Sequence, residues 1–510
     1  MRNLVLVLGD QLDSESAAFD GFDPRRDGIV MIEALEESKH VWSHKTRTAL
    51  FLSAMRHFAK EIEARGWPIE YRALDREADA SLATGLAATI KAQKPERVIV
   101  VEPGDLRVRA SLEASCAKAK CEIEFRLDRH FMCSIDEFKK WAGKNKSLRM
   151  EFFYREMRKK HRVLMDGEKP VGGEWNYDAE NRKSFGKGGP ENVPTPPSFA
   201  PDVITKGVIE LVETLFNDHP GSTEHFNWPV TRKEALSALD DFIEKRLGDF
   251  GPHQDAMWTK LHFGWHSLLS SSLNLKLLNP REVVDAAEKA FKKRALDLAS
   301  VEGFIRQVLG WREFMRGVYF IDMPSLKSAN HFGHTNALPE WYWTGKTQMN
   351  CLKHSIDQTL QFGYAHHIQR LMITGMFGIT AEIEPQQLCD WYLAVYVDAI
   401  EWVELPNTAG MALFANGGRF TSKPYVASGA YVKRMSNYCD GCRYKPDQRT
   451  GTKACPLSTL YWNFLDKHEE TFASNPRTSL MVKNLQRMTD EERAAVRTDA
   501  KRMLKDLNAL

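Results

Sequence analysis

Three cysteines near the C-terminal end of the chain have a spacing that metal sites use. Cys439 and Cys442 are separated by two residues, and Cys455 follows after twelve more. A C-x-x-C pair occurs in zinc sites and in iron–sulfur sites, and a cysteine followed by proline, as in Cys455-Pro456, also closes the bacterial ferredoxin pattern. No second C-x-x-C pair lies nearby, so we expect the fourth ligand to come from a distant segment.

Cys351, within TQMNCLKHS, is the best candidate for that ligand, because Cys389 lies in an apolar helical context that is typical of a buried core residue. Spacing alone leaves zinc and iron–sulfur equally favoured. A third interpretation is that these cysteines are unrelated buried thiols.

Composition predicts an ordinary soluble protein. The chain has 510 residues, 43% of them hydrophobic, and a formal net charge of +2. No apolar run is long enough to span a bilayer, and the N-terminal MRNLVLVLGDQLD has too short an apolar run for a signal peptide and reads better as a buried strand. We therefore expect a cytoplasmic protein, in which thiols stay reduced and a cysteine cluster indicates metal rather than disulfides.

The sequence predicts an α/β domain followed by a larger helical domain. Segments 4–9, 28–34, 68–74, 96–103 and 121–127 read as strands, and they alternate with helical patterns at 46–66 and 108–117. This alternation is typical of a doubly wound parallel sheet, although neither G-x-G-x-x-G nor a P-loop is present. A stretch rich in Gly and Pro at 184–201 indicates a linker or a long surface loop. The expected domains are 1–140, an interdomain region 141–215, and 216–510.

Three segments of the helical half carry chemistry-bearing residues. HFGWHSLLSSSLNLKLLNPREV, residues 262–283, contains hydroxyls at a predicted helix start, where free backbone N–H groups suit a pyrophosphate. The other two segments are EGFIRQVLGWREFMRG and GYAHHIQRLMITGMF, and the segment DAIEWVELPN follows them. These segments and the four cysteines resemble the iron–sulfur bacterial cryptochromes and photolyases, also called prokaryotic (6-4) photolyases. The resemblance covers essentially the whole chain and includes the phrases LGDQL, WNYDAENR, WYWTGK and KPYVASGAYVKRMSNYC.

The resemblance implies three cofactors and their ligands. It implies a [4Fe-4S] cluster, FAD, and a 6,7-dimethyl-8-ribityllumazine antenna in the N-terminal domain. The cluster ligands would be Cys351, Cys439, Cys442 and Cys455. The FAD-binding residues would be Ser267, Leu268, Ser270, Gln307, Trp311, Arg312, Arg370, Asp398, Glu404 and Asn407, where Glu404 replaces an asparagine that many photolyases carry beside flavin N5. The antenna residues would be Asp10, Gln11 and Glu37.

The His366-His367 pair, by itself, is more typical of two satisfied polar side chains than of a catalytic pair. In the resembling family, His-His-x-x-Arg is the (6-4) pattern, whereas cyclobutane-specific enzymes place asparagine at the second position. Histidine can donate a proton near neutral pH and asparagine cannot. The resemblance therefore implies (6-4) chemistry with His366 and His367 as the catalytic residues, and His367 as the preferred acid.

Other aromatic residues read as core from periodicity alone. The resemblance instead implies that Trp391, Tyr392 and Trp343 carry electrons to FAD, and that Tyr425 and Met411 line a lesion pocket. The basic, aromatic segment 149–162 fits DNA contact or a solvated helix face equally well.

The expected function is light-dependent repair of (6-4) photoproducts in UV-damaged DNA by a monomer. The alternatives are a cryptochrome-type photoreceptor and an iron–sulfur nucleic-acid enzyme such as a primase, and the FAD elements disfavour the latter.

Overall fold

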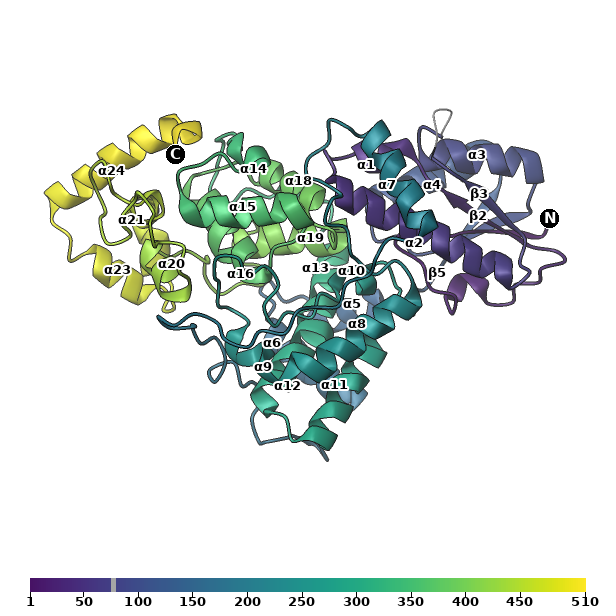
Figure 1. Ribbon diagram of the computed structural model, residues 1–510, viewed down its shortest axis with the longest axis horizontal. Helices are drawn as coiled ribbons and strands as arrows, with labels where there is room; N and C mark the ends of the chain where they lie inside the picture. Colours follow the sequence, from purple (N-terminus) through teal and green to yellow (C-terminus); the bar gives the residue numbers. More distant parts are fainter. Residues whose placement is uncertain (75–78) are drawn as a thin grey trace.

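The computed structural model describes residues 1–74 and 79–510. It confirms an N-terminal α/β part and a larger helical part, which lie side by side with the two chain termini at opposite ends of the molecule (Figure 1). Within the described residues, no helix combines the length and the apolar character that crossing a membrane requires.

The N-terminal part is built on a five-stranded parallel sheet in the order β3-β2-β1-β4-β5. The three central strands are almost fully buried, as expected when helices cover both faces of a parallel sheet. The order reverses between β1 and β4, so their carboxyl ends form a topological switch point where ligands bind in such sheets. The strands are β1 (Asn3–Leu6), β2 (Gly28–Ile32), β3 (Ile69–Arg72), β4 (Arg97–Val101) and β5 (Glu122–Arg126).

Helices flank this sheet and extend the chain toward the second part. The expected helix at 46–66 is α2, and the one at 108–117 is α4. Those that precede the long loop are α1 (Leu35–Lys39), α2 (Lys45–Ala64), α3 (Leu82–Gln93), α4 (Leu106–Ala119), α5 (Ile135–Ala142) and α6 (Met150–His161). A two-residue hairpin, β6 (Met165–Asp166) with β7 (Lys169–Pro170), follows α6.

Residues 171–202 contain no helix or strand, in agreement with the linker expected from Gly and Pro. From there on, the described chain is helical. The main helices are α7 (Val203–Leu215), α8 (Arg232–Lys245), α9 (Leu247–His253), α10 (Ser270–Asn274), α11 (Pro280–Arg294), α12 (Leu298–Ile305), α13 (Glu313–Asp322), α14 (Trp341–Thr344), α15 (Asn350–Phe362), α16 (His367–Gln369), α17 (Met376–Thr380), α18 (Pro385–Val395), α19 (Glu401–Leu405), α20 (Gly429–Met435), α21 (Pro456–Lys467), α22 (Glu469–Ala473), α23 (Ser479–Leu485) and α24 (Asp490–Lys505).

Three π-helical segments interrupt this helical part: η2 (Arg306–Arg312), η4 (Arg370–Gly375) and η5 (Pro406–Ala412). A π-helical turn inserts an extra residue into a helix and is frequent at functional sites. Each of these segments contains residues that the sequence marked as cofactor contacts, and η4 packs directly against η5.

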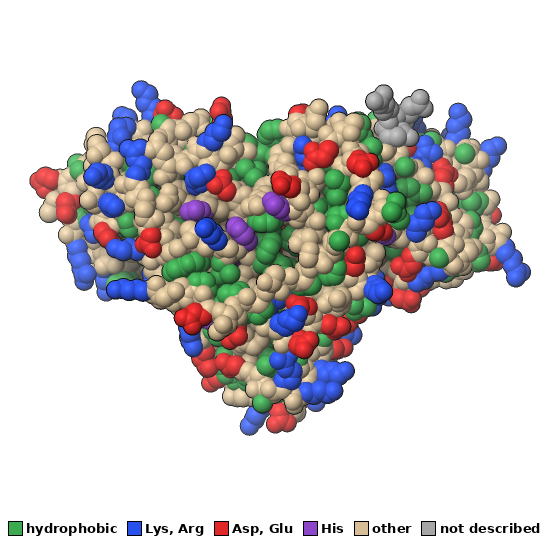
Figure 2. Space-filling view, in the orientation of Figure 1, with side chains coloured by type: hydrophobic (Ala, Val, Ile, Leu, Met, Phe, Trp, Pro, Cys, Tyr) green, Lys and Arg blue, Asp and Glu red, His purple; other side chains and the backbone are tan. Residues whose placement is uncertain are grey.

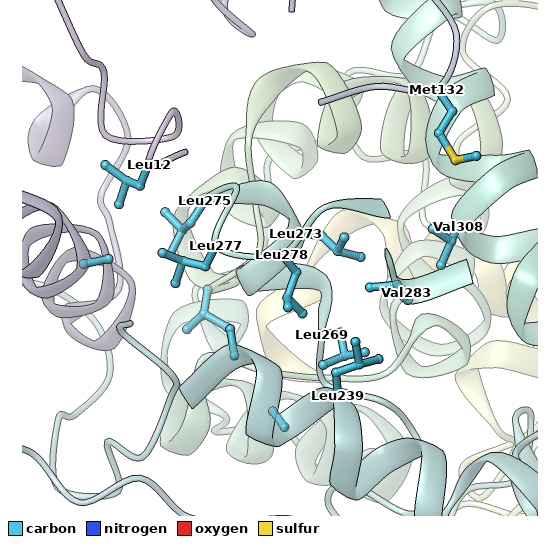
Figure 3. Close-up of a cluster of buried hydrophobic side chains, with 14 of the residues drawn as sticks. Leu12, Met132, Leu239, Leu269, Leu273, Leu275, Leu277, Leu278, Val283 and Val308 are labelled. Atoms are coloured by element: carbon cyan, nitrogen blue, oxygen red, sulfur yellow. The ribbon is translucent and has the colours of Figure 1, made fainter. Parts of the chain in front are cut away.

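The two parts share one hydrophobic core. Leu12, in the loop after β1, donates its backbone N–H to the carbonyl oxygen of Leu275 at 3.0 Å. Figure 3 shows the leucines around α10 packed among Leu239, Val283 and Val308 of the surrounding helices, with Leu12 reaching them from the sheet side. The core therefore holds the short serine-rich helix in place from behind.

Candidate functional site

A partly buried ion pair joins two of the predicted flavin contacts. Arg370, the first residue of η4, donates from Nη1 and Nη2 to the two carboxylate oxygens of Asp398 at 3.0 and 3.2 Å. Ser270 Oγ donates to Asp398 Oδ2 at 2.7 Å, and Asn274 Nδ2 donates to the Asp398 carbonyl oxygen at 2.7 Å. The fold thus brings together the serine-rich element, the His-His helix and the DAIEWVELPN loop, as the sequence predicted.

The serine-rich element contains buried polar groups that are available to bind a ligand. Leu268 adopts a left-handed backbone conformation with φ of 59°, and this bend precedes α10. Ser267 Oγ accepts the backbone N–H of Leu269 at 3.4 Å. The buried hydroxyls of Ser271 and Ser272 have no hydrogen-bond partner within the protein. A buried polar group without a partner is costly, so these hydroxyls fit a polar ligand such as a cofactor.

Glu404 and Asn407 lie on neighbouring turns of α19 and η5. Glu404 is buried, and this burial raises the pKa of its carboxyl to about 7, although the nearby Arg370 opposes the shift. Thr408 Oγ1 donates to Glu404 Oε1 at 2.6 Å. Asn407 Nδ2 donates to the Val403 carbonyl oxygen at 2.8 Å. A carboxyl that titrates near neutrality is suited to holding or releasing a proton at this position.

The predicted FAD-binding residues on η2 make their contacts away from the Arg370–Asp398 pair. They are Gln307, Trp311 and Arg312. Gln307 Nε2 donates to the carbonyl oxygen of Gly303 at 2.9 Å, and Trp311 packs on the hydrophobic core. The Arg312 guanidinium lies over the ring of Phe131 at 4.5 Å and faces the α/β part. It touches the serine-rich element through the Leu273 carbonyl oxygen, at 3.2 Å.

A histidine cluster lies at the start of α16. The rings of His266 and His366 stack with their centroids 4.6 Å apart. One ring nitrogen from each of His266, His366 and His367 lies within 4.8 Å of the other two. His366 is buried and His266 is half-buried, whereas the His367 side chain is 50% exposed. Figure 2 shows histidine side chains gathered near the middle of one face, beside a patch of hydrophobic side chains.

Electrostatics separates the roles available to these histidines. Burial lowers the pKa of His266 to about 3, and burial lowers the pKa of His366 well below its ordinary value, so both stay neutral near pH 7. Nδ1 of His366 has no partner within the protein. His367 Nε2 lies 3.2 Å from Asp255 Oδ1. This bond orients the imidazole, and its half exposure makes His367 the member of the cluster that a ligand from solvent can reach.

Asp255 and His266 were not singled out from the sequence. Asp255 belongs to no recognisable motif, and His266 lies in the serine-rich segment 262–283 but received no role there. Burial alone would raise the pKa of Asp255, but the hydrogen bond from His367 and the charges of His367 and Arg182 lower it overall. Arg182 Nε lies 3.6 Å from Asp255 Oδ2 and also pairs with Asp178. The carboxylate therefore stays charged beside His367.

The two predicted lesion contacts lie in different surroundings. Tyr425 is half-buried, and burial raises the pKa of its hydroxyl while the nearby charge of Arg182 lowers it. Tyr425 thus shares Arg182 with Asp255. Met411, in η5, packs on the core cluster that also contains Leu12 and Leu275.

Aromatic rings lead away from the Arg370–Asp398 pair. The Arg370 guanidinium lies 3.7 Å from the Tyr396 ring centroid. Trp391 is fully buried, with its ring centroid 5.9 Å from Tyr396, 5.3 Å from Tyr392 and 6.5 Å from Trp343. The predicted residues Trp391, Tyr392 and Trp343 are therefore neighbours, and Tyr396 joins them although the sequence did not mark it.

The four predicted metal-ligating cysteines surround one small cavity. Cys351 is near the start of α15, Cys439 and Cys442 follow α20, and Cys455 precedes α21. The remaining lining is mostly apolar, from Met349, Val432, Tyr438, Tyr444 and Leu457. Among the described residues, no three of these thiols have their sulfur atoms within 4.8 Å of one another. One tetrahedral zinc would hold its sulfurs about 3.8 Å apart. The thiols are thus spread more widely than a single zinc ion requires. Cys389 is buried elsewhere, in α18.

A second cavity lies at the switch point of the sheet, between the two parts of the protein. Asp10 and Glu37 line it, together with apolar residues that include Leu393 and Ile400 of the helical part. Burial raises the pKa of Asp10 to about 6, and Glu37 pairs with Arg107 at 2.9 Å. Gln11 lies outside this lining, with its Nε2 donating to the Val101 carbonyl oxygen at 3.0 Å.

Comparison with known proteins places these features in a family. Residues 5–228 match the family model described as "Deoxyribodipyrimidine photo-lyase-related protein". A protein of Agrobacterium fabrum named "(6-4) photolyase" is 46% identical over 510 residues, which are the full length of both chains.

Two solved structures share the fold at low sequence identity. They are a bacterial class III photolyase from Agrobacterium tumefaciens (TM-score 0.57, 16% identity, covering 85% of this chain and 86% of that one) and the Synechocystis cryptochrome (TM-score 0.57, 12% identity, covering 85% and 88%). The full-length identity confirms the resemblance inferred from the motifs, and this chain belongs to the photolyase and cryptochrome family, in the branch of the bacterial (6-4) photolyases.

Proposed function

We propose that this protein repairs (6-4) pyrimidine–pyrimidone photoproducts in UV-damaged DNA, using light and a bound FAD. The observation that carries the proposal is the half-exposed His367, held by a charged Asp255 beside the neutral His266 and His366. The (6-4) adduct needs a proton to return a hydroxyl group from one base to the other, and a hydrogen-bonded histidine near a carboxylate can supply it. The relative named (6-4) photolyase supports the same activity.

FAD would bind around the Arg370–Asp398 pair. Ser267, Leu268 and Ser270 would face the phosphates, with the unpartnered hydroxyls of Ser271 and Ser272 close by. The ring system would be surrounded by Arg370, Asp398, Glu404 and Asn407. The η2 residues would contact FAD from behind the serine-rich element, and they are Gln307, Trp311 and Arg312. When bound and reduced, FAD supplies the electron for repair under blue light. Glu404, with a pKa of about 7, would hold a proton near the ring.

The lesion would enter beside the histidine cluster. Tyr425 shares Arg182 with Asp255, and Met411 lies on η5 near the proposed flavin contacts. His367 would donate the proton on Nδ1, while Asp255, which is hydrogen-bonded to Nε2, orients the ring and stabilises its charge. Neutral His366, with Nδ1 free of protein partners, would accept a hydrogen bond from the flipped base. Extruding a damaged base costs less than extruding a normal one, which favours the lesion.

Two further groups are part of the proposal. The cavity between Cys351, Cys439, Cys442 and Cys455 fits a [4Fe-4S] cluster, because the donor set is four thiols and their spread exceeds that of a zinc site. The cavity lined by Asp10 and Glu37 would hold 6,7-dimethyl-8-ribityllumazine as an antenna, since its walls combine apolar side chains with a few polar groups. Gln11 would support this cavity from behind through its bond to Val101.

The deciding experiment is a repair assay with an oligonucleotide that carries one defined (6-4) photoproduct. The flavin-containing protein, reduced beforehand with dithionite, should restore the two pyrimidines under blue light and not in the dark. An oligonucleotide with a cyclobutane dimer serves as the matched control and should stay unrepaired. Absence of (6-4) repair by a protein that still contains reduced FAD would reject the proposal.

A light receptor without repair activity is the competing function. The Synechocystis cryptochrome matches the fold as well as the photolyase does, with the same TM-score of 0.57. That function predicts flavin photoreduction together with no loss of (6-4) lesions in the same assay.

A further inference from the structure

We propose that Arg306 is a positioning residue for His367, and that it acts through a continuous chain of alternating charges that ends at the Asp255 carboxylate. The inference deepens the proposed function and rests on it in one respect, namely that the His367 imidazole is the group that meets the lesion. We call this set the charge chain, and its members in order are Glu302, Arg306, Asp178, Arg182, Asp255 and His367.

The inner half of the charge chain is buried. Arg306, the first residue of η2, has its Nε 3.4 Å from Glu302 Oε1, one turn earlier on α12. Its Nη2 donates to Oδ1 of Asp178, in the loop of residues 171–202, at 2.8 Å. The side chains of Glu302 and Arg306 are 0% and 5% exposed. A buried charge must be paired, and one planar guanidinium can serve both carboxylates because its donors point in different directions.

The outer half of the charge chain reaches the histidine cluster. The second oxygen of Asp178, Oδ2, pairs with Arg182 Nη2, and Arg182 Nε lies 3.6 Å from Asp255 Oδ2. The remaining Asp255 oxygen, Oδ1, lies 3.2 Å from His367 Nε2. Each inner member of the chain thus uses a different atom for each of its two neighbours, so the position of one side chain constrains the next.

The backbone around Asp178 is held by the same helix that carries Glu302. The backbone N–H of Tyr177 donates to Glu302 Oε2 at 3.3 Å. Asn181 Nδ2 donates to the carbonyl oxygen of Ala299, also in α12, at 3.0 Å. Asp178 lies between these two anchors in the sequence, so α12 holds the stretch of loop that presents its carboxylate to Arg306 and Arg182.

The charge chain controls which ring nitrogen of His367 is free. Asp255 occupies Nε2, so Nδ1 is the nitrogen left for a ligand. The His367 side chain is 50% exposed, so packing restrains only part of the ring. The orientation of the imidazole therefore depends on Asp255, whose other oxygen faces Arg182. A general acid acts only when its proton lies within hydrogen-bond reach of the acceptor, so a loss of this orientation should slow proton transfer.

The test replaces Arg306 with glutamine, which carries no charge and cannot bridge Glu302 and Asp178 as the guanidinium does. Arg158→Gln is the matched control. Arg158 is equally buried, and its donors bond backbone carbonyl oxygens, such as that of Leu164 at 2.6 Å.

The first readout is the His367 ring itself, in protein without DNA. Histidine labelled with nitrogen-15 gives two ring-nitrogen resonances for each residue, and those of His367 are identified by their absence in His367→Asn. At pH 9 in the wild type and in Arg158→Gln, the Nε2 that bonds Asp255 should keep its proton and the two resonances should stay far apart. In Arg306→Gln the proton should exchange between both nitrogens, and the resonances should converge. An unchanged His367 pattern in Arg306→Gln would overturn the inference.

The second readout is a comparison of single and double variants in repair by the FAD-containing protein. Arg306→Gln and Arg182→Gln should each lower the repair rate of the bound (6-4) oligonucleotide by roughly 10–100-fold, the scale of a misplacement of about 1 Å. The variant with both changes should be no slower than the slower single variant, because both changes break one chain. Arg158→Gln, compared at equal FAD content, should repair normally. Losses that multiply in the double variant would contradict a shared chain.

Two further outcomes separate the possible failures. If Arg306→Gln is insoluble, Arg182→Gln decides alone, because the Arg182 side chain is 53% exposed and its replacement leaves the core intact. A His367 ring that stays ordered in Arg182→Gln would overturn the inference. If the wild type does not repair (6-4) lesions while His367 still loses its order in Arg306→Gln, the proposed function fails and the positioning role stands.

Discussion

His367 Nε2 and Asp255 Oδ1 lie 3.2 Å apart, although 111 residues separate the two in the chain. His367 belongs to a motif that the sequence shows, and Asp255 to none. Together they place a half-exposed imidazole beside a charged carboxylate, an arrangement that is suited to general acid catalysis.

Replacing His367 with asparagine should abolish most repair. Asparagine keeps similar size and some hydrogen bonding but cannot donate a titratable proton. The repair rate for the (6-4) oligonucleotide should fall by roughly 10²–10⁴-fold, the usual contribution of a general acid. FAD content should stay unchanged. His262→Asn, a half-buried histidine outside the cluster, is the control and should repair normally. Near-normal repair by His367→Asn would assign the proton to another group.

Replacing Cys439 with serine should remove the iron, because the proposed cluster needs all four thiolates and links segments that are distant in sequence. Iron and acid-labile sulfide, measured on anaerobically purified protein, should both drop, along with the yield of soluble protein. Cys389→Ser, the buried cysteine of α18, should keep its iron. Stoichiometric zinc without labile sulfide in the wild type would contradict the cluster assignment.

Replacing Trp391 with phenylalanine should leave FAD bound and slow its photoreduction by thiols, because the first oxidisable ring of the path is lost. Steady-state absorption under blue light measures this rate. Photoreduction at the wild-type rate would mean that Trp391 only packs, and that Tyr392 or Tyr396 starts another path.

Replacing Glu37 with alanine should lower the lumazine content, since the carboxylate and its partner Arg107 provide charge at the edge of the cavity. Fluorescence of the extracted chromophore measures occupancy, and the FAD content is the internal reference. Glu36→Ala, on the same helix and 48% exposed at its side chain, should retain the antenna. Equal lumazine occupancy in Glu37→Ala would move the antenna to another site.

Replacing Glu404 with glutamine should change how stability depends on pH. The pKa of Glu404 is raised from 4.5 to about 7 in the folded protein, so the folded state binds more protons than the unfolded state between these values. Wild-type stability should therefore fall as pH rises through this window and then level off. At pH 8 the variant should be more stable by up to about 3 kcal/mol, since one pKa unit corresponds to about 1.4 kcal/mol.

Denaturant unfolding of the flavin-containing protein at pH 5 and pH 8 measures this difference. Glu384→Gln, an exposed carboxyl, should match the wild type at both values. A Glu404→Gln variant with the wild-type pH profile would show that the carboxyl stays charged in the folded protein.

Local patterns in the sequence were enough to predict the five strands of the sheet and two of the helices beside it. The runs at 4–9, 28–34 and 96–103 each contain a continuous apolar stretch because strands of a covered parallel sheet are buried on both faces, and they form β1, β2 and β4. The serine-rich and His-His motifs were readable because each lies within one short segment. The π-helical segments were not predicted, because an extra residue in a turn leaves the helical apolar pattern nearly intact.

The sequence by itself determined the family, the α/β-then-helical order, and the four cysteines and two histidines that the proposal uses, because these follow from residue identity and local spacing. The tertiary structure alone decided which distant residues meet: Asp255 with His367, Tyr396 with Arg370, and Trp42 with Trp343. It also turned Arg312 toward Phe131 and Gln11 toward Val101. Such contacts depend on how whole elements pack against one another. That packing is determined by the shape and burial of side chains across the molecule, so it cannot be predicted from a short stretch of sequence.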